Sequence, residues 1–369
     1  MEVSMSEWPM VNQSLLSSND EMFIDDDLMT QSVPQVSCQQ AADVALQLYG
    51  IRGEIKLLQG ERDLNFCLTV SPEQRYMLKV INAAESAEVS HFQTSLLQHI
   101  ARQAPDLPIP RVIMTRDRRA EPIIEIAGIP LRVRLVGYLE GTPQHQAFPS
   151  VALMHNLGEM LARLDRALGN FTHPAANRSL LWDISRAEQV RPYLTFVQDA
   201  QQRQCINRIF ERYDEFVAPA LISLRRQTIH NDLNPYNVLV NTRHPTLVAG
   251  VIDFGDALHA PLVCELATAL AYQIGDGADP FEYAVPFITA YHQQLPLTTK
   301  EIALLPDLIA MRMVLTMIIA QWRASLYPAN RDYLLRNLPR CWRSLNKMAN
   351  YSYEQCFSRL QQACYQEGV

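Results

Sequence analysis

Two short polar segments, separated by a pair of apolar runs, constrain the fold of this chain more than any other feature. The first segment covers residues 230–237 and the second covers residues 253–256. The runs between them, residues 238–240 and 247–252, are short and rich in Val and Ile, as buried strands are. A turn through residues 241–245 would make the runs a hairpin, which brings both polar segments to one place.

The side chains of these segments suit phosphoryl transfer. That reaction needs a carboxylate beside the attacking hydroxyl and oxygen ligands for the Mg²⁺ ions that neutralise the nucleotide phosphates. We predict that Asp232 is the catalytic base and that His230 braces its loop by hydrogen bonds. Asn237 and Asp253 are the predicted magnesium ligands. Turn formation explains any one of these residues equally well, but it does not explain two motifs in this order with strands between them.

The paired motifs resemble those of the aminoglycoside phosphotransferase and choline kinase group, which is the small-molecule branch of the protein-kinase-like fold. Asn231 stands where protein kinases usually carry Arg, and only residues 257–261 precede the next apolar, helix-forming run. So short a segment disfavours an extended peptide substrate. Upstream, residues 48–53 and the run Gly-Glu-Arg-Asp-Leu-Asn-Phe at 60–66 resemble the hydroxylysine kinase family in particular.

The resemblance implies an α+β, bilobal protein-kinase-like fold, with a small β-rich N-terminal lobe and a larger, mostly helical C-terminal lobe that carries the catalytic hairpin. We expect a mobile acidic tail over residues 1–34 and a nucleotide-binding lobe over residues 35–137. A hinge is expected at residues 138–143, followed by the catalytic and substrate lobe at 144–369. After residue 149 the spacing predicts helices, interrupted by strand only at the hairpin of residues 238–252.

Several upstream residues fit a nucleotide site for ATP or GTP. Lys79 lies in an apolar strand pattern at residues 76–80 and is the candidate contact to the phosphates. A helix predicted at residues 85–102 would supply its partner; Gln93 is better placed there than the two glutamates near the helix start, and the choice stays open. The turn at residues 60–66 would cover the phosphates with a single glycine. The backbone at Leu139 and Gly141 is expected to pair with the purine edge.

The acceptor is predicted to be a small molecule with a hydroxyl group and a positive charge. Asp183, Asp256 and Glu265 are the candidate contacts to its ammonium group. The resemblance implies 5-hydroxy-L-lysine, with ATP or GTP as donor and Mg²⁺ as the metal; homoserine, choline and aminoglycosides are alternatives. A catalytically silent, nucleotide-binding regulatory module is an alternative of another class. The presence of the predicted base, metal ligands and phosphate lysine together speaks against it.

Charge and cysteine usage exclude some other classes. A net charge of -7 argues against a nucleic-acid surface and favours a cationic substrate. The seven cysteines lack metal-ligand spacing and are expected to be reduced thiols in a cytoplasmic protein without a signal peptide. The most apolar helical run, residues 311–322, is shorter than the ~20 residues of a membrane span and is predicted to be a buried helix. The sequence does not indicate an oligomeric state.

Overall fold

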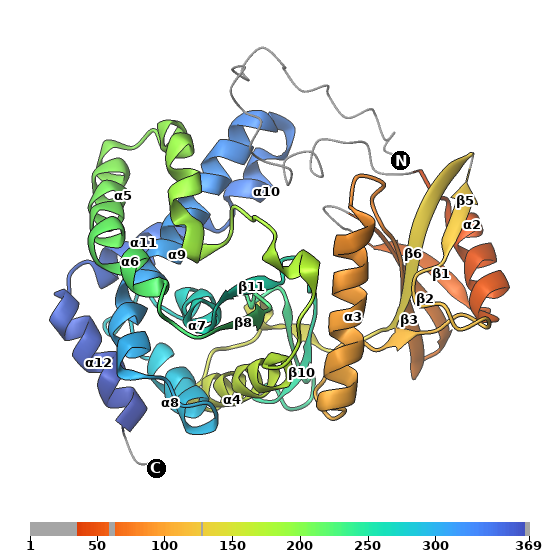
Figure 1. Cartoon of the computed structure of the whole chain (residues 1–369), viewed down its shortest axis with the longest axis horizontal. Helices are drawn as coiled ribbons and strands as arrows, with labels where there is room; N and C mark the ends of the chain where they lie inside the picture. The colour runs from red at the N-terminus through yellow and green to blue at the C-terminus, as the bar shows by residue number, and fades with distance from the viewer. Residues whose placement is uncertain (1–34, 59–62, 127, 366–369) are drawn as a thin grey trace.

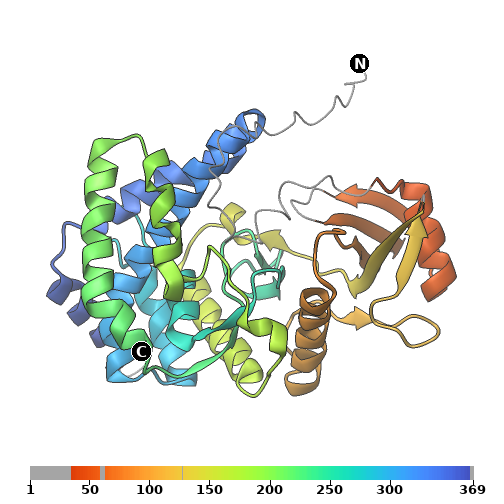
Figure 2. The same ribbon diagram turned by 45° about the horizontal axis from the view of Figure 1, so that its top comes forward.

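The computed structural model describes residues 35–58, 63–126 and 128–365. The tail predicted over residues 1–34 and the first part of the predicted phosphate turn therefore lie outside the described residues. The described chain has a β-sheet region at one side and a mostly helical region at the other, with helix α3 between them (Figure 1). Figure 2 shows the same two regions from a second direction, again on either side of α3.

The N-terminal region is built on a sheet that has six strands in the described residues, all in antiparallel pairs. The order is β1-β2-β3-β6-β4, and β5 pairs with β6. One face of this sheet and helix α2 (Cys38–Val44) enclose a core that includes Phe66, Leu78 and Val133. The strands are β1 (Glu54–Leu58), β2 (Leu64–Ser71), β3 (Gln74–Val80), β4 (Val112–Ile113), β5 (Ile123–Ile126) and β6 (Ile129–Gly137).

Helix α3 (Ala87–Gln103) connects the two regions. Ser86 caps its first turn by accepting a hydrogen bond from the Val89 backbone N–H, at 3.2 Å. Phe92 on its buried face packs against Phe171 of the helical region, with the ring centroids 6.0 Å apart. The Nε2 of His99 also lies 3.0 Å from the carbonyl oxygen of Ala167. The helix is therefore held in place by contacts with the helical region.

The helical region confirms most of the predicted helices but divides two of them. The notable divisions are between residues 184 and 221, which hold a 3-10 segment (Ile184–Phe196), α5 and α6, and between residues 331 and 365, which hold three α-helices. The principal helices are α4 (Val151–Leu168), α5 (Ala200–Arg212), α6 (Ala218–Leu221), α7 (Leu262–Ala271), α8 (Ala284–Gln294), α9 (Thr299–Leu326), α10 (Arg331–Leu335), α11 (Leu338–Met348) and α12 (Tyr353–Tyr365).

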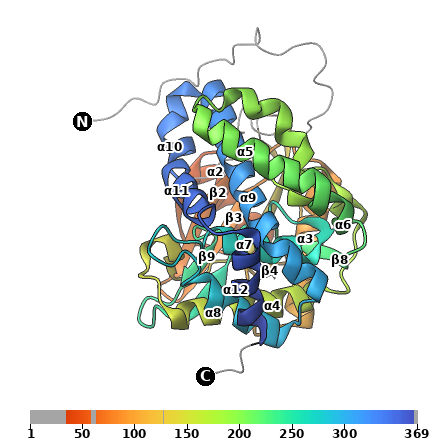
Figure 3. The same ribbon diagram turned by 90° about the vertical axis from the view of Figure 1, so that its left-hand side faces the viewer.

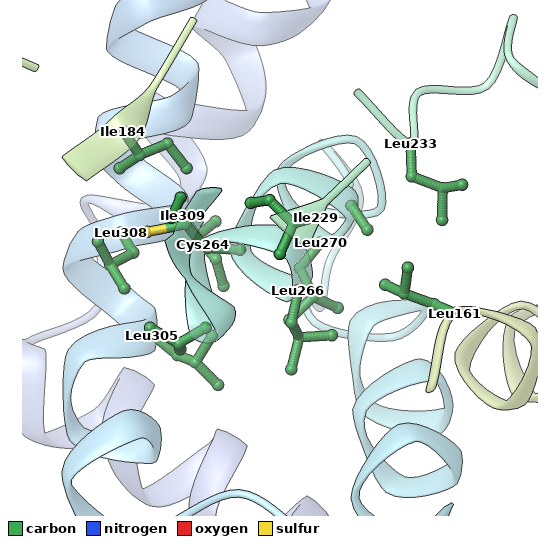
Figure 4. Packing of buried hydrophobic residues seen from close by; sticks show 14 of the residues in the cluster. Leu161, Ile184, Ile229, Leu233, Cys264, Leu266, Leu270, Leu305, Leu308 and Ile309 are labelled. Atoms are coloured by element: carbon green, nitrogen blue, oxygen red, sulfur yellow. The ribbon is translucent and has the colours of Figure 1, made fainter. Parts of the chain in front are cut away.

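Helix α9 is the central element of this region, and it contains the apolar run of residues 311–322 that was predicted to be a buried helix. Its 28 residues begin at a capping box formed by Thr298 and Glu301. By length and hydropathy (2.0) it is, among the described residues, the one helix apolar enough to cross a membrane, yet 78% of that window is buried within the protein. It packs against α7, as Figure 3 shows from the side, and Leu305 and Ile309 lie near α7 in Figure 4. The burial of α9 in the core therefore explains its apolar character.

Two small sheets in the helical region carry the polar segments. The predicted hairpin is present as β9 (Val238–Val240) and β10 (Val248–Val251), and β7 (Thr142–Pro143) adds to its edge. The expectation that no other strand interrupts the helices was wrong, because β8 (Arg226–Ile229) pairs with β11 (Leu258–Pro261). Strands β8 and β11 lie far apart in sequence. Both are short and half-polar, so neither shows the apolar pattern by which a strand is predicted from sequence.

Candidate active site

The two strand pairs place both polar segments side by side. The first segment connects β8 to β9, and the second connects β10 to β11. Because β9 pairs with β10 and β8 pairs with β11, the two loops are held together at both ends. The Ile252 N–H donates to the Asn237 carbonyl oxygen at 2.9 Å, and Leu258 lies opposite Ile229. The site therefore rests on backbone hydrogen bonds rather than on flexible connections.

The carboxylate of Asp232 is oriented by three side-chain donors. Its Oδ2 accepts hydrogen bonds from Nδ2 of Asn234 at 2.9 Å and from Nδ2 of Asn237 at 2.8 Å. Its Oδ1 accepts one from Nη2 of Arg312 at 3.1 Å. The Asp232 side chain is still 20% exposed, so a substrate can approach it. A fixed, accessible carboxylate is the geometry that a general base needs.

Negative charge is concentrated around this carboxylate. Burial raises the pKa of Asp232 to about 7, and the neighbouring charges of Asp256 and Asp253 add to the increase. The guanidinium of Arg312 acts in the opposite direction and lowers that pKa. Asp253 is exposed and Asp256 is half-buried. Three carboxylates within electrostatic reach of one another favour the binding of a cation.

The two predicted metal ligands have oxygen atoms suited to Mg²⁺. Because the Nδ2 of Asn237 donates to both the backbone oxygen and Oδ2 of Asp232, its amide oxygen faces away from that carboxylate. Asp253 adopts a left-handed backbone with φ of 61°, and its Oδ1 accepts a hydrogen bond from the Gly255 N–H at 3.1 Å. Within the described residues its Oδ2 has no hydrogen-bond donor. Mg²⁺ commonly takes one or two protein oxygens and completes its shell with water and phosphate, and this pair fits that pattern. The described residues contain no cluster of three His, Cys, Asp or Glu side chains able to hold a metal by themselves.

His230 lies behind the site and joins its two loops. The side chain is fully buried. Its Nδ1 accepts a hydrogen bond from the Asp232 N–H at 3.2 Å, which leaves Nε2 to donate to the Ile252 carbonyl oxygen at 3.1 Å. Phe254 packs edge-on against the imidazole, with the ring centroids 4.6 Å apart. This placement fits the bracing role expected of His230 and keeps its ring away from the substrate.

Two of the three expected substrate contacts do not fit their positions. Glu265 is 0% exposed, and its Oε2 accepts a hydrogen bond from the backbone N–H of Asn231 at 2.8 Å. It therefore supports the catalytic loop from α7, and burial raises its pKa. Asp183 is 1% exposed and caps the 3-10 segment by accepting from the Ser185 N–H at 2.8 Å. Of the three, Asp256 is the one whose charge raises the pKa of Asp232.

The partner of Lys79 is a residue that the sequence reasoning missed. Its Nζ lies 3.1 Å from Oδ2 of Asp63, whose Oδ1 accepts a hydrogen bond from the Asn82 N–H at 3.0 Å. Gln93 is largely buried on α3 and makes no hydrogen bond to Lys79 within the described residues. The register of the sheet explains this pairing, because Asn65 lies opposite Lys79 across β2 and β3 and Asp63 lies two residues away on the same face.

Helix α3 is attached to the sheet through a buried ion pair between Arg134 and Glu121. Arg134 of β6 is buried and donates from Nη2 to Oε1 of Glu121 at 2.8 Å. The same oxygen accepts hydrogen bonds from the hydroxyls of Ser90 and Thr94 on α3, at 2.6 and 2.5 Å. Arg134 also lies opposite Lys79 in the register of β3 and β6. The position of α3 thus depends on a buried ion pair next to Lys79, the lysine that is predicted to contact the nucleotide phosphates.

The expected hinge, residues 138–143, contacts strand β3 on one side and strand β9 on the other. Arg75 of β3 pairs with Glu140 at 2.6 Å and lies 4.5 Å from the centre of the Tyr138 ring. A Cβ at Gly141 would meet the Val240 carbonyl oxygen at 2.8 Å, so glycine is needed where the hinge crosses β9. The purine contacts expected at Leu139 and Gly141 stay a prediction.

Comparison with known proteins agrees with this geometry. The profile of the phosphotransferase enzyme family matches residues 54–302, and the chain belongs to that family. It is accordingly a phosphotransferase that acts on a hydroxyl group, and a small-molecule kinase.

The most informative relatives are small-molecule kinases. The chain is 25% identical over 350 residues to the hydroxylysine kinase of Xenopus laevis, which covers 88% of this chain and 93% of that protein. It is 29% identical over 244 residues to the homoserine kinase of Methylobacillus glycogenes, covering 64% of this chain and 69% of that protein. The structure of amicoumacin kinase hAmiN in complex with AMP-PNP, Ca²⁺ and Ami superposes with a TM-score of 0.63 at 16% identity, over 87% of this chain and 97% of that one. The last likeness confirms the predicted kinase-like fold.

Proposed function

We propose that this protein transfers the γ-phosphoryl group of ATP or GTP to the hydroxyl of an amino-bearing metabolite, and that 5-hydroxy-L-lysine is the acceptor. The observation that carries the chemistry is the Asp232 carboxylate, fixed by Asn234, Asn237 and Arg312 beside two further carboxylates. The observation that favours this acceptor is the match to hydroxylysine kinases over most of both chains. Homoserine is the second candidate, since a homoserine kinase matches over about two thirds of this chain.

In the proposed reaction Asp232 takes the proton of the acceptor hydroxyl as that oxygen attacks the γ-phosphorus. Asn237 and Asp253 would hold Mg²⁺, which would neutralise the charge of the nucleotide phosphates. Lys79 aligns those phosphates; it lies against Asp63, which fixes its position on β3. His230 and Glu265 keep the loop in place through its backbone N–H groups. Asp256 is the carboxylate placed to attract the ammonium group of the acceptor.

A diphosphate-release assay tests the proposal. Purified protein with ATP or GTP and Mg²⁺ is offered hydroxy amino acids, amino alcohols, choline and aminoglycosides. We expect the largest acceptor-dependent release with 5-hydroxy-L-lysine. If homoserine or an aminoglycoside gave the largest release instead, the proposed acceptor would be wrong but the proposed reaction would stand. No acceptor-dependent release from any compound would favour the silent nucleotide-binding module.

The role of Asp232 is tested by Asp232→Ala. We expect turnover to be abolished while nucleotide affinity, measured by calorimetry, stays close to that of the wild type. Asp276→Asn is a matched control, because Asp276 is an exposed acid of the same lobe that pairs with Arg343 at 2.7 Å. Turnover retained by Asp232→Ala would refute the assignment of Asp232 as the base.

A further inference from the structure

The interior of the helical region holds a charged side chain that the reaction outlined above does not explain. Arg312 lies in the middle of α9 and is 1% exposed. Its Nη1 donates to the carbonyl oxygen of Trp182 at 2.9 Å, and its guanidinium lies 4.9 Å from the centre of the Trp182 ring. Burial lowers the pKa of Arg312, whereas Tyr272 lies close enough for its charge to raise it. A guanidinium held in this way cannot turn toward a substrate without breaking several contacts.

Within the part of the chain that the structure describes, Arg312 forms an ion pair with one carboxylate, that of the proposed base. Nη2 of Arg312 lies 3.1 Å from Oδ1 of Asp232. A buried arginine is costly unless it is paired, and here the pairing partner is a catalytic group rather than a structural one. The pairing thus links the core helix α9 to the reacting atoms.

The two oxygens of Asp232 are not equivalent in this arrangement. An ionised carboxylate offers roughly two lone-pair positions on each oxygen. Two amide groups, those of Asn234 and Asn237, donate to Oδ2 and occupy both of its positions. Among the described residues, Oδ1 accepts only the hydrogen bond from Arg312, which leaves one of its lone pairs open.

We propose that Oδ1 of Asp232 is the atom that receives the acceptor's proton, and that Arg312 is the positioning residue that aims it. This inference rests on the proposed function. In the step, the acceptor hydroxyl oxygen forms a bond to the γ-phosphorus and its proton moves to Oδ1. The bond from the γ-phosphorus to the bridging oxygen breaks, and its electron pair leaves with the nucleoside diphosphate. The proton on Oδ1 is later released to solvent.

Arginine suits this task because its planar group is fixed at two points. One nitrogen is anchored on Trp182 and another contacts Asp232, so the plane of the guanidinium sets the direction of the carboxylate. The final torsion of an Asp side chain is broad. Asn234 and Asn237 hold Oδ2, whereas Arg312 holds Oδ1, so without Arg312 we expect the carboxylate to tilt about its contacts at Oδ2. Misplacing a reacting group by about 1 Å can reduce the rate by about 10²-fold.

The test compares three variants in the full-length protein. We expect Arg312→Met to lower kcat by about 10²-fold while the nucleotide Kd and the KM of the acceptor stay near the wild-type values. Arg312→Lys keeps the charge and one donor, so it should recover part of kcat. The matched control is Arg225→Met, which removes the ion pair with buried Glu301 at the start of the same helix, 2.7 Å between Nε and Oε1. This control should lower thermal stability without a selective loss of kcat.

A structural readout separates this inference from the proposed function. In crystals of Arg312→Met we expect the Asp232 carboxylate to be rotated relative to crystals of the wild type. An unrotated carboxylate, or a wild-type kcat in Arg312→Met, would overturn the inference whatever the acceptor is. If the wild type phosphorylates no compound in the panel but the carboxylate rotates, the proposed function fails while the positioning role of Arg312 stands.

Discussion

Replacing Glu265 tests most directly whether the helix behind the catalytic loop supports it or binds substrate. The sequence favoured a substrate contact, whereas the structure buries Glu265 completely and bonds it to the backbone of Asn231. Two substitutions separate these roles. Glu265→Ala removes the acceptor, and Glu265→Gln keeps a side-chain oxygen in nearly the same place.

The expected loss of unfolding free energy follows from the hydrogen-bond donor that the substitution leaves without a partner. In Glu265→Ala the N–H of Asn231, itself 0% exposed, loses its partner, and an unsatisfied buried donor costs about 1–3 kcal/mol of unfolding free energy. Asn231 has a left-handed backbone with φ of 65°, which depends on such support. Because Glu265→Gln still accepts this hydrogen bond, we expect it to lose less than about 1 kcal/mol.

Urea unfolding and steady-state kinetics measure the two effects. We expect Glu265→Ala to lose stability and kcat together, and Glu265→Gln to keep the acceptor KM of the wild type. Asp279→Asn serves as the control, since Asp279 is an acid paired with Arg359 at 2.8 Å, with side-chain exposures of 42% and 41%. An exposed ion pair contributes at most about 1 kcal/mol. If Glu265→Gln raised the acceptor KM strongly at unchanged stability, the support role would be refuted and the substrate contact restored.

Two further predictions concern the core and the pH dependence. Gly158 of α4 faces α8 so closely that an added Cβ would overlap the Phe287 carbonyl oxygen, so we expect Gly158→Ala to destabilise the protein by about 1–3 kcal/mol in urea unfolding. Gly277→Ala, where a Cβ meets no atom within 4 Å, should leave stability unchanged, and equal losses in both variants would contradict the packing argument. Asp232 must be ionised to accept a proton and its pKa is raised to about 7, so kcat/KM for the acceptor should fall as the pH drops through that value. A profile that is flat from neutral pH down to the usual range of an aspartate would contradict the raised pKa of Asp232.

Much of the site could be predicted from the spacing of residues along the sequence. Asp232, Asn237 and Asp253 lie within one strand-turn-strand unit, so their order and the apolar runs between them indicate their convergence. The hydrogen bond from Ile252 to Asn237 and the pairing of β9 with β10 agree with that reasoning. Strand β8 and its pairing with β11 were not predicted, because the partners are separated by the whole catalytic segment.

Pairing between distant charged residues could not be read in the same way. The partner of Lys79 was left open between Gln93 and two glutamates near the start of α3, but Asp63 lies beside it. Glu265 was expected in the cleft, but it supports Asn231 from behind. Each of these side chains had several chemically equivalent competitors, and the outcome depends on which of them the packing brings within hydrogen-bonding distance.

The sequence by itself determined the catalytic segment, because short strands and turn residues encode their geometry in neighbouring backbone groups. It also indicated the division into a sheet region and a helical region, since hydrophobic periodicity is a local property. Only the tertiary structure decided which buried charge faces which loop. Arg312 and Asp232 are eighty residues apart, and their contact exists because α9 is buried against the catalytic loop. That contact depends on how the core packs, which no spacing within either segment specifies.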